Sequence, residues 1–235
     1  MSARLEVAVL DMAGTTIDEG QQVYRVLAET AIAYGAAPSQ ADIARWHGAA
    51  KHEALRALLT KPGGEPPSAD LLDTVVADFR SRLTAAYAIS PPCPLPGVTD
   101  AMAALRSAGI RVALTTGFDR DIVDSLISAL GWEGDSVVDD VVCGSDVAAG
   151  RPAPFMIFRA MENLGVVGVD RVLVAGDTPR DLQAGTNSGA AFVVGVLSGA
   201  GDAVELGRLP HTHLVASVAD LPTLLELRDP AARPA

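Results

Sequence analysis

The chain contains 235 residues, of which 29 are acidic and 18 are Lys or Arg, giving a formal net charge of −11. This acidic balance argues against a nucleic-acid partner, which needs a basic face. The sequence has no charged leader and no long uninterrupted apolar stretch, so we expect a cytoplasmic protein with no membrane partner. Its length fits one substantial domain, or a core with a modest insertion.

Short β-branched runs alternate with helix-like segments along most of the chain. From residue 110 onward, each run is followed by a helix-like segment or a loop, which is typical of a parallel sheet covered on both faces. The sequence therefore predicts a doubly wound, Rossmann-like α/β core. Its expected strands are residues 5–10, 110–114, 137–143, 171–175, 191–196 and 213–217.

The interval between the first and second runs has a different pattern. Apolar residues recur there at helical spacing, for example from Leu72 to Phe79, and two loops rich in Pro and Gly interrupt it. The pattern predicts an all-helical insertion after the first strand, roughly residues 17–93. Residues 1–16 and 94–235 are then expected to form the core.

Polar residues follow four of the expected strands at their carboxyl ends, where doubly wound sheets bind ligands. Asp11 follows the first strand, and Thr116 and Gly117 follow the second. Arg151 follows the third at a longer distance, and Asp177 follows the fourth. One crevice is therefore expected to contain carboxylates, a hydroxyl group and a cation.

These residue types fit attack on a phosphoryl group. A carboxylate cannot approach an anionic phosphorus centre without charge neutralisation, and Asp11 and Asp177 would repel each other. Mg²⁺ would relieve both problems, because it binds protein and substrate oxygens together. The turn at Thr116 is expected to begin a helix over residues 118–130 whose free N–H groups face the site, and Arg151 would supply a fixed cation. Asp11 could then form an aspartyl-phosphate.

Each of these residues also has a simpler interpretation. Asp11 could be a turn residue, Thr116 a helix cap and Arg151 a surface charge. Asp181 forms a capping-box pattern with Thr178, which explains it structurally. The four signals nevertheless occur in order on four successive strands, which favours the catalytic interpretation.

These motifs, in this order, are similar to those of the haloacid dehalogenase superfamily over essentially the whole chain. The resemblance implies that Asp11 is the nucleophile and that Thr116, Gly117 and Arg151 bind the phosphoryl group. It also implies that the helical insertion is a small cap domain over the site. A homodimer formed through the cap is a further suggestion of the resemblance.

The same resemblance implies Mg²⁺ as the cofactor. Its ligands would be Asp11, Asp177 and the backbone carbonyl of Ala13, with Asp181 beside them. Ala13 is also a departure, because phosphatases of this family carry there a second Asp that protonates the leaving alkoxide. Loss of a general acid typically costs about 10²–10⁴-fold in rate.

Further features resemble the phosphonoacetaldehyde hydrolase branch, whose motifs read DxAGTT, TTG and GRP with a cap lysine. Here Arg151 replaces the usual lysine of the third motif, and the insertion carries Lys51. A lysine amine can condense with an aldehyde β to phosphorus, and the iminium then accepts the electrons of the C–P bond. The expected substrate is therefore phosphonoacetaldehyde or a related 2-oxoalkylphosphonate, with no acid needed at Ala13.

Several alternatives stay open. Lys51 could instead contact an anionic group of the substrate, or lie at the surface. The family's cap histidine and its tyrosine after TTG are Ala54 and Phe118 here, and His47 or His52 could take over proton transfer. The alternative activity is a small-molecule phosphomonoesterase resembling phosphoglycolate phosphatase. A haloacid dehalogenase, which needs no Mg²⁺, and a non-catalytic phospho-ligand sensor are less favoured.

Overall fold

A six-stranded parallel sheet forms the centre of the protein. The computed structural model describes residues 5–133 and 137–227. Each run expected to form a strand contributes one, so the predicted α/β fold is confirmed. The strands are β1 (Val7–Asp11), β4 (Arg111–Thr116), β5 (Asp140–Cys143), β6 (Val172–Gly176), β7 (Phe192–Val196) and β8 (His213–Val215). Their order across the sheet is β5-β4-β1-β6-β7-β8.

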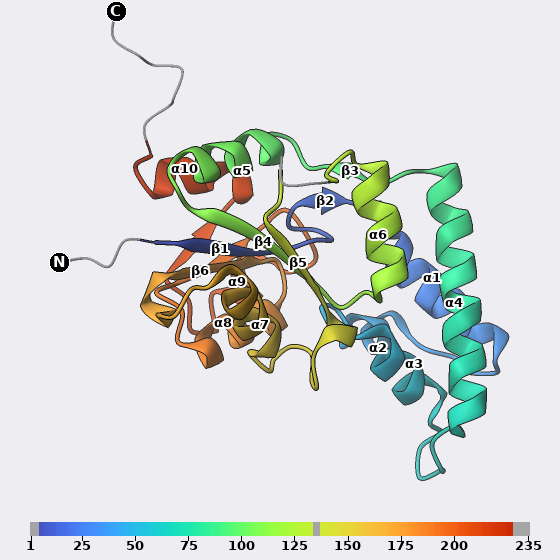
Figure 1. Ribbon diagram of the computed structural model, residues 1–235. Helices are drawn as coiled ribbons and strands as arrows, with labels where there is room; N and C mark the ends of the chain where they lie inside the picture. Colours follow the sequence, from blue (N-terminus) through green and yellow to red (C-terminus); the bar gives the residue numbers. More distant parts are fainter. Residues whose placement is uncertain (1–4, 134–136, 228–235) are drawn as a thin grey trace, which may run out of the picture.

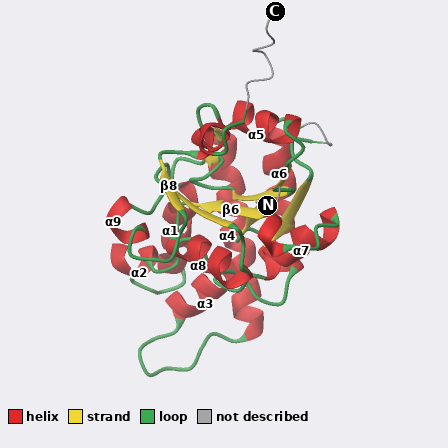
Figure 2. Ribbon diagram, turned by 90° about the vertical axis from the view of Figure 1, so that its left-hand side faces the viewer, coloured by secondary structure: helices red, strands yellow, loops and turns green. Residues whose placement is uncertain are grey.

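Helices cover both faces of the sheet, and Figure 2 shows the strands as one layer between them. Alternate residues of β1 point to opposite faces: Val7 and Val9 belong to one hydrophobic cluster, and Ala8 and Leu10 to another. The first cluster packs against α7 (Phe155–Leu164) and α8 (Pro179–Ser188), and the second against α5 (Val98–Ser107), α6 (Arg120–Ala129) and α10 (Leu221–Leu224). The short α9 (Ala203–Leu206) follows β7, and 3₁₀ turns occupy Gly144–Asp146, Val169–Arg171 and Val218–Asp220.

Four helices lie between the short strands β2 (Ile17–Asp18) and β3 (Cys93–Pro94), which follow β1 and precede α5. They are α1 (Gln22–Ala33), α2 (Gln40–Ala44), α3 (Lys51–Leu59) and α4 (Ala69–Ile89). These helices pack on one another, and Figure 1 shows them gathered beyond the ends toward which the strands of the sheet run. We call residues 19–92 the inserted segment.

The expectation of an all-helical insertion is wrong at its two ends. Short strands β2 (Ile17–Asp18) and β3 (Cys93–Pro94) pair antiparallel and bring the beginning and end of the inserted segment together. Two-residue strands are too short to show a period-2 pattern, so the sequence does not distinguish them from loop. A neck of two adjacent backbones therefore joins the inserted segment to the core.

The order of the strands places β1 between β4 and β6. Asp11 is level with Thr115 of β4, and β6 ends at Gly176 on the other side. From β1 the chain continues to β4 and β5 on one side, and it then returns to β6, β7 and β8 on the other side of β1. The carboxyl end of β1 is therefore at the switch point where such folds bind ligands. In the described residues, no helix is both long enough and apolar enough to cross a membrane.

Candidate active site

Three carboxylates meet at the ends of β1 and β6. Asp11 is the last residue of β1, Asp177 directly follows β6, and Asp181 lies in the first turn of α8. All three are buried, and one ligand oxygen from each lies within 4.8 Å of the others. The structure thus brings together the acidic residues that the sequence placed at separate strand ends.

Local hydrogen bonds fix two of these carboxylates. The Thr15 hydroxyl donates to Asp177 Oδ1 at 3.0 Å, and the backbone N–H of Ala200 donates to Asp177 Oδ2 at 2.7 Å. Asp181 is held by the expected capping box, in which its Oδ2 accepts from the Thr178 backbone N–H at 3.0 Å. A Cβ at Gly199 would lie only 2.0 Å from Asp177 Oδ2, so glycine is required where this loop passes the carboxylate.

A single guanidinium lies among the carboxylates. Arg151 donates to Asp11 Oδ1 at 2.6 Å and to the Thr115 hydroxyl at 2.8 Å, and its Nη1 lies 2.8 Å from Asp181 Oδ1. Burial, followed by repulsion from Asp11 and Asp181, raises the pKa of Asp177 to about 8. Burial raises the pKa of Asp181 to about 6, although Arg151 opposes this change. One guanidinium therefore does not neutralise the cluster.

The donor set fits a divalent cation. The available donors are carboxylate oxygens, which hard cations such as Mg²⁺ prefer, and they are close together and shielded from solvent. Ala13 lines the adjoining pocket, so the expected backbone ligand also lies at the site. The unbalanced negative charge of the three carboxylates gives a physical reason for a cation here.

The turn after β4, at Thr116 and Gly117, lines the same pocket as Asp11. The Thr116 hydroxyl accepts a hydrogen bond from the Phe118 backbone N–H at 3.1 Å. Gly117 passes so close to the inserted segment that a Cβ would lie 2.7 Å from the Ala49 carbonyl oxygen. The expected helix start at residue 118 is wrong: α6 begins at Arg120, and Phe118 turns its ring into the pocket. The backbone N–H groups of Gly117 and Phe118, which the sequence predicts at the start of a helix, therefore belong to a turn before α6.

Lys51 is the first residue of α3 and is 5% exposed. Its Nζ donates to the Ala49 carbonyl oxygen at 2.9 Å and lies 5.0 Å from the centre of the Tyr24 ring and 5.7 Å from that of Phe118. In the part of the chain that the structure describes, Lys51 forms no ion pair. Burial lowers the pKa of the amine to about 8, against the attraction of Asp11. With this pKa, about a tenth of the amine is neutral at pH 7.

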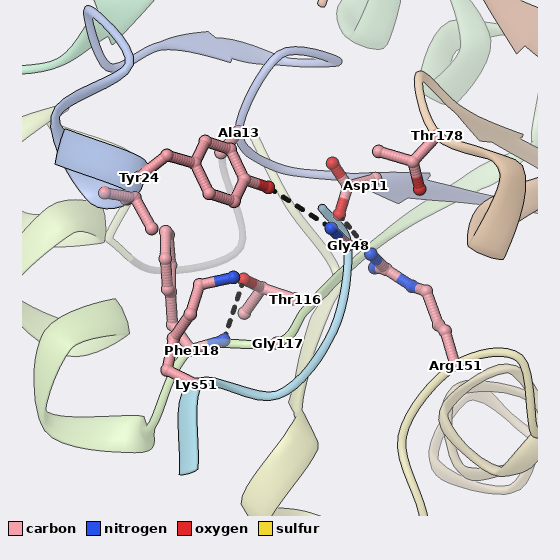
Figure 3. Close-up of a pocket in the computed structure, with 11 residues that line it drawn as sticks. Asp11, Ala13, Tyr24, Gly48, Lys51, Thr116, Gly117, Phe118, Arg151 and Thr178 are labelled. Carbon is pink, nitrogen blue, oxygen red and sulfur yellow. Dashed lines mark hydrogen bonds and ion pairs between the residues drawn. The ribbon is translucent and has the colours of Figure 1, made fainter. Parts of the chain in front are cut away.

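A small pocket of about 20 Å³ joins these groups. In Figure 3, Lys51, Tyr24 and Phe118 stand on one side of it, and Asp11 and Arg151 on the other. The pocket holds little more than a water molecule. Its lining residues are Asp11, Ala13, Val23, Tyr24, Gly48, Lys51, Thr116, Gly117, Phe118, Arg151 and Thr178.

Sequence reasoning missed Tyr24, Gly48 and Thr178 as parts of this pocket. The Tyr24 hydroxyl accepts a hydrogen bond from the Gly48 backbone N–H at 3.2 Å, which fixes the loop before Lys51. Gly48 has a φ of 72°, and a Cβ there would lie 2.5 Å from the Thr178 hydroxyl. In the sequence, only the presence of a glycine at position 48 indicated a special backbone position. The contacts of Gly48 with Tyr24 and Thr178 could not be predicted, because those residues are distant in the sequence.

Neither expected proton-transfer histidine lines the pocket. His47 packs against Tyr24 with ring centres 4.1 Å apart, and burial, followed by the charge of Lys51, lowers its pKa. His52 is exposed on α3 and borders a separate cleft. Ala54 is fully buried and offers no polar group. The charge of Lys51 therefore acts on His47, although His47 does not line the pocket.

Two of the curated proteins that are similar to this chain have related names. The curated phosphonoacetaldehyde hydrolase of Paraburkholderia xenovorans is 34% identical over 204 residues, which cover 82% of this chain and 74% of that protein. A phosphonoacetaldehyde hydrolase-like protein of Syntrophobacter fumaroxidans is 34% identical over 200 residues, covering 77% of this chain and 68% of that protein.

Solved structures share the fold. A phosphonoacetaldehyde hydrolase-like protein from Oleispira antarctica superposes with a TM-score of 0.81 at 23% identity, covering 96% of this chain and 92% of that one. A predicted phosphoglycolate phosphatase from Haemophilus somnus gives 0.74 at 16% identity, covering 95% and 99%. A model of haloacid dehalogenase-like hydrolases matches residues 5–189. The chain therefore belongs to the haloacid dehalogenase-like hydrolases.

Proposed function

We propose that this hydrolase cleaves the C–P bond of phosphonoacetaldehyde or a closely related 2-oxoalkylphosphonate. The observation that carries the proposal is the environment of Lys51. Its amine is buried, is free of any ion pair among the described residues and faces the same pocket as the Asp11 carboxylate. Two curated relatives named for phosphonoacetaldehyde hydrolysis, at 34% identity, support the same reaction.

Asp11 is the proposed nucleophile toward phosphorus. Arg151, which already contacts its carboxylate, would bind the phosphoryl oxygens together with Thr116 and the backbone of the Gly117 turn. Asp11, Asp177 and Asp181, with the Ala13 carbonyl, would hold Mg²⁺, which neutralises the charge of the phosphoryl group. Asp11 then carries the phosphoryl group as an aspartyl-phosphate, which water opens.

Lys51 is the proposed electron sink. Its neutral amine would bond to the carbonyl carbon of the substrate, and the carbonyl oxygen leaves as water. When Asp11 attacks phosphorus, the electrons of the C–P bond move to the carbon and neutralise the iminium as an enamine. The carbon is later protonated, and hydrolysis of the product iminium releases the aldehyde and restores Lys51. Ala13 is compatible with this route, because no alkoxide leaves.

We further propose that the inserted segment acts as a cap domain. It supplies Lys51, Tyr24 and Gly48 to the pocket, whereas Asp11 and Arg151 come from the core. The pocket of about 20 Å³ is too small for a phosphonate, so the inserted segment has to move for substrate to bind there. The expected homodimer through this segment stays a prediction, which the mass of the protein in solution tests.

The decisive experiment compares wild type, Lys51→Arg and Lys61→Arg on phosphonoacetaldehyde and on small phosphate esters. Lys61 is the only other lysine and is exposed, so it is the matched control. We expect turnover of the phosphonate to be lost in Lys51→Arg alone, since a guanidinium stays protonated. Borohydride added with an aldehyde phosphonate should label Lys51. Phosphonate turnover retained by Lys51→Arg would contradict the proposal, and turnover of esters only would favour the phosphomonoesterase.

A further inference from the structure

Glu19 is a buried carboxylate that the proposed reaction does not yet use. It lies between β2 and α1 and is 6% exposed. Its Oε2 accepts a hydrogen bond from the backbone N–H of Val23, at 2.9 Å, in the first turn of α1. Among the residues that the structure describes, no Arg, Lys or His forms an ion pair with it. A buried carboxylate without a cation partner is costly and calls for an explanation.

Three helices of the inserted segment pack together near this carboxylate, and Val23, whose N–H binds Glu19, lines the same pocket as Lys51. Tyr24 comes from α1, Tyr87 from α4 and Lys51 from the start of α3. Burial is the main cause of the raised pKa of both phenols, and the charge of Glu19 adds to it. The buried Tyr87 hydroxyl makes no hydrogen bond of normal geometry with any described residue. The cluster thus brings together a buried acid and a buried amine, neither of which forms an ion pair among the described residues, and a phenol whose hydroxyl is buried.

Two carboxylates act electrostatically on the amine of Lys51, namely Asp11 and Glu19. Asp11 is already paired with Arg151. In the proposed reaction, Asp11 also becomes the acyl phosphate, so its own carboxylate charge is absent when the product iminium forms. Glu19 is not consumed at any step. Burial raises the pKa of the Glu19 carboxyl, and the positive charge of Lys51 opposes this rise. A positive iminium at the same nitrogen would also favour the ionised form, so Glu19 is the acid of the inserted segment that can serve as an anion through the whole cycle.

We propose that Glu19 is a positioning residue that acts through Lys51, as the buried counter-charge of the iminium. The inference rests on the proposed function. When the amine bonds to the carbonyl carbon, the oxygen leaves as water with one proton from the amine and one from solvent. The nitrogen keeps one proton and a positive charge in a pocket with little water. Glu19 stabilises that charge through space, and the lack of a direct ion pair leaves Nζ free to react.

The expected consequence is a shift in the protonation of Lys51. Removing the anion makes the ammonium less favourable, so the pKa of Lys51 should fall in Glu19→Gln. The glutamine amide oxygen can still accept from the Val23 N–H, so the start of α1 is preserved. Other groups facing Lys51 or Glu19 are unchanged in this variant; they are Asp11, Asp18, Tyr24, His47, Tyr87, Arg151 and Arg180.

The test measures the amine without turnover. Metal-free protein is incubated with acetaldehyde and cyanoborohydride over a range of pH, and mass spectrometry of the Lys51 peptide gives the rate of ethylation. The midpoint of rate against pH reports the pKa of the amine, because only the neutral amine adds to the aldehyde. We expect the midpoint in Glu19→Gln to lie lower by about one pH unit. Glu19→Asp, which keeps the charge on a shorter side chain, should lie between this variant and wild type.

Glu53→Gln is the matched control, because Glu53 is exposed on the same helix two residues from Lys51. Its midpoint should equal that of wild type. An unchanged midpoint in folded Glu19→Gln, or an equal shift in Glu53→Gln, would overturn the proposed role of Glu19. Neither result would affect the proposed function. If Glu19→Gln does not fold, an unshifted Glu19→Asp has the same meaning. Absence of any Lys51 label in wild type would overturn the proposed function as well.

Discussion

Replacing Lys51 with Met tests how much the fold is destabilised by burying this amine. Methionine keeps an unbranched side chain of similar length but carries no charge. Burial lowers the pKa of Lys51 from its ordinary value of 10.5 to about 8 in the folded protein. Each pKa unit corresponds to about 1.4 kcal/mol, so the buried ammonium costs about 3 kcal/mol at neutral pH.

The sign of the effect follows from proton binding. Below about pH 8 the amine is protonated in both the folded and unfolded states, so wild type carries the full cost. Between that pH and 10.5 the unfolded chain binds the proton more tightly, so the stability of wild type rises with pH. Lys51→Met lacks this group. Its advantage in free energy of unfolding should therefore shrink by about 2–3 kcal/mol from about pH 7 to about pH 10.

Urea unfolding of metal-free protein, followed by circular dichroism at several pH values, measures this difference. Lys61→Met serves as the control, because Lys61 is exposed in a loop and its replacement should give a difference that does not depend on pH. If the difference between Lys51→Met and wild type were constant over the same range, the amine would not be held in a destabilised charge state. A neutral, nucleophilic Lys51 near neutral pH would then have no physical basis.

Three further predictions concern the rest of the site. Ala13→Asp should raise turnover of alkyl phosphates by about 10²-fold by supplying a general acid, with no gain on phosphonates, as steady-state kinetics will show. Gly48→Ala should lower kcat/KM by about tenfold, because its φ of 72° and the Thr178 hydroxyl both oppose a Cβ. Because the pKa of Asp177 is raised to about 8, Mg²⁺ affinity measured by calorimetry should rise with pH up to that value, with proton release below it.

The sequence predicts those parts of the fold that depend on local pattern. Strands of a parallel sheet are buried on both faces, so their β-branched runs stand out, and the residues that follow them lie at one edge. The same pattern predicts from the sequence that Asp11, Asp177 and Arg151 lie at one site. The capping box of Thr178 and Asp181 was equally visible, because its two members are three residues apart.

Features that depend on contacts between distant residues were not predictable. The start of α6 is one example: the carboxylate of Asp119, just before the helix, is bound by Arg80 of α4 at 2.7 Å. The pocket residue Tyr24 is another, because it lies beside the buried stripe of α1 and its hydroxyl meets Gly48 of a different loop. The burial of Glu19 likewise depends on how α1, α3 and α4 pack together. Helical periodicity identifies such helices but does not specify their neighbours.

The neck formed by β2 and β3 has a consequence for how this enzyme can change. Both crossings between the core and the inserted segment occur at two paired residues, Ile17 with Pro94 and Asp18 with Cys93. A different set of helices could be attached at this junction while β1 and Asp11 keep their places in the sheet. The core, which carries the chemistry at phosphorus, and the inserted segment, which selects the bond that is cleaved, could then change independently of each other. Exchange of residues 19–92 between relatives is expected to transfer substrate preference as one unit.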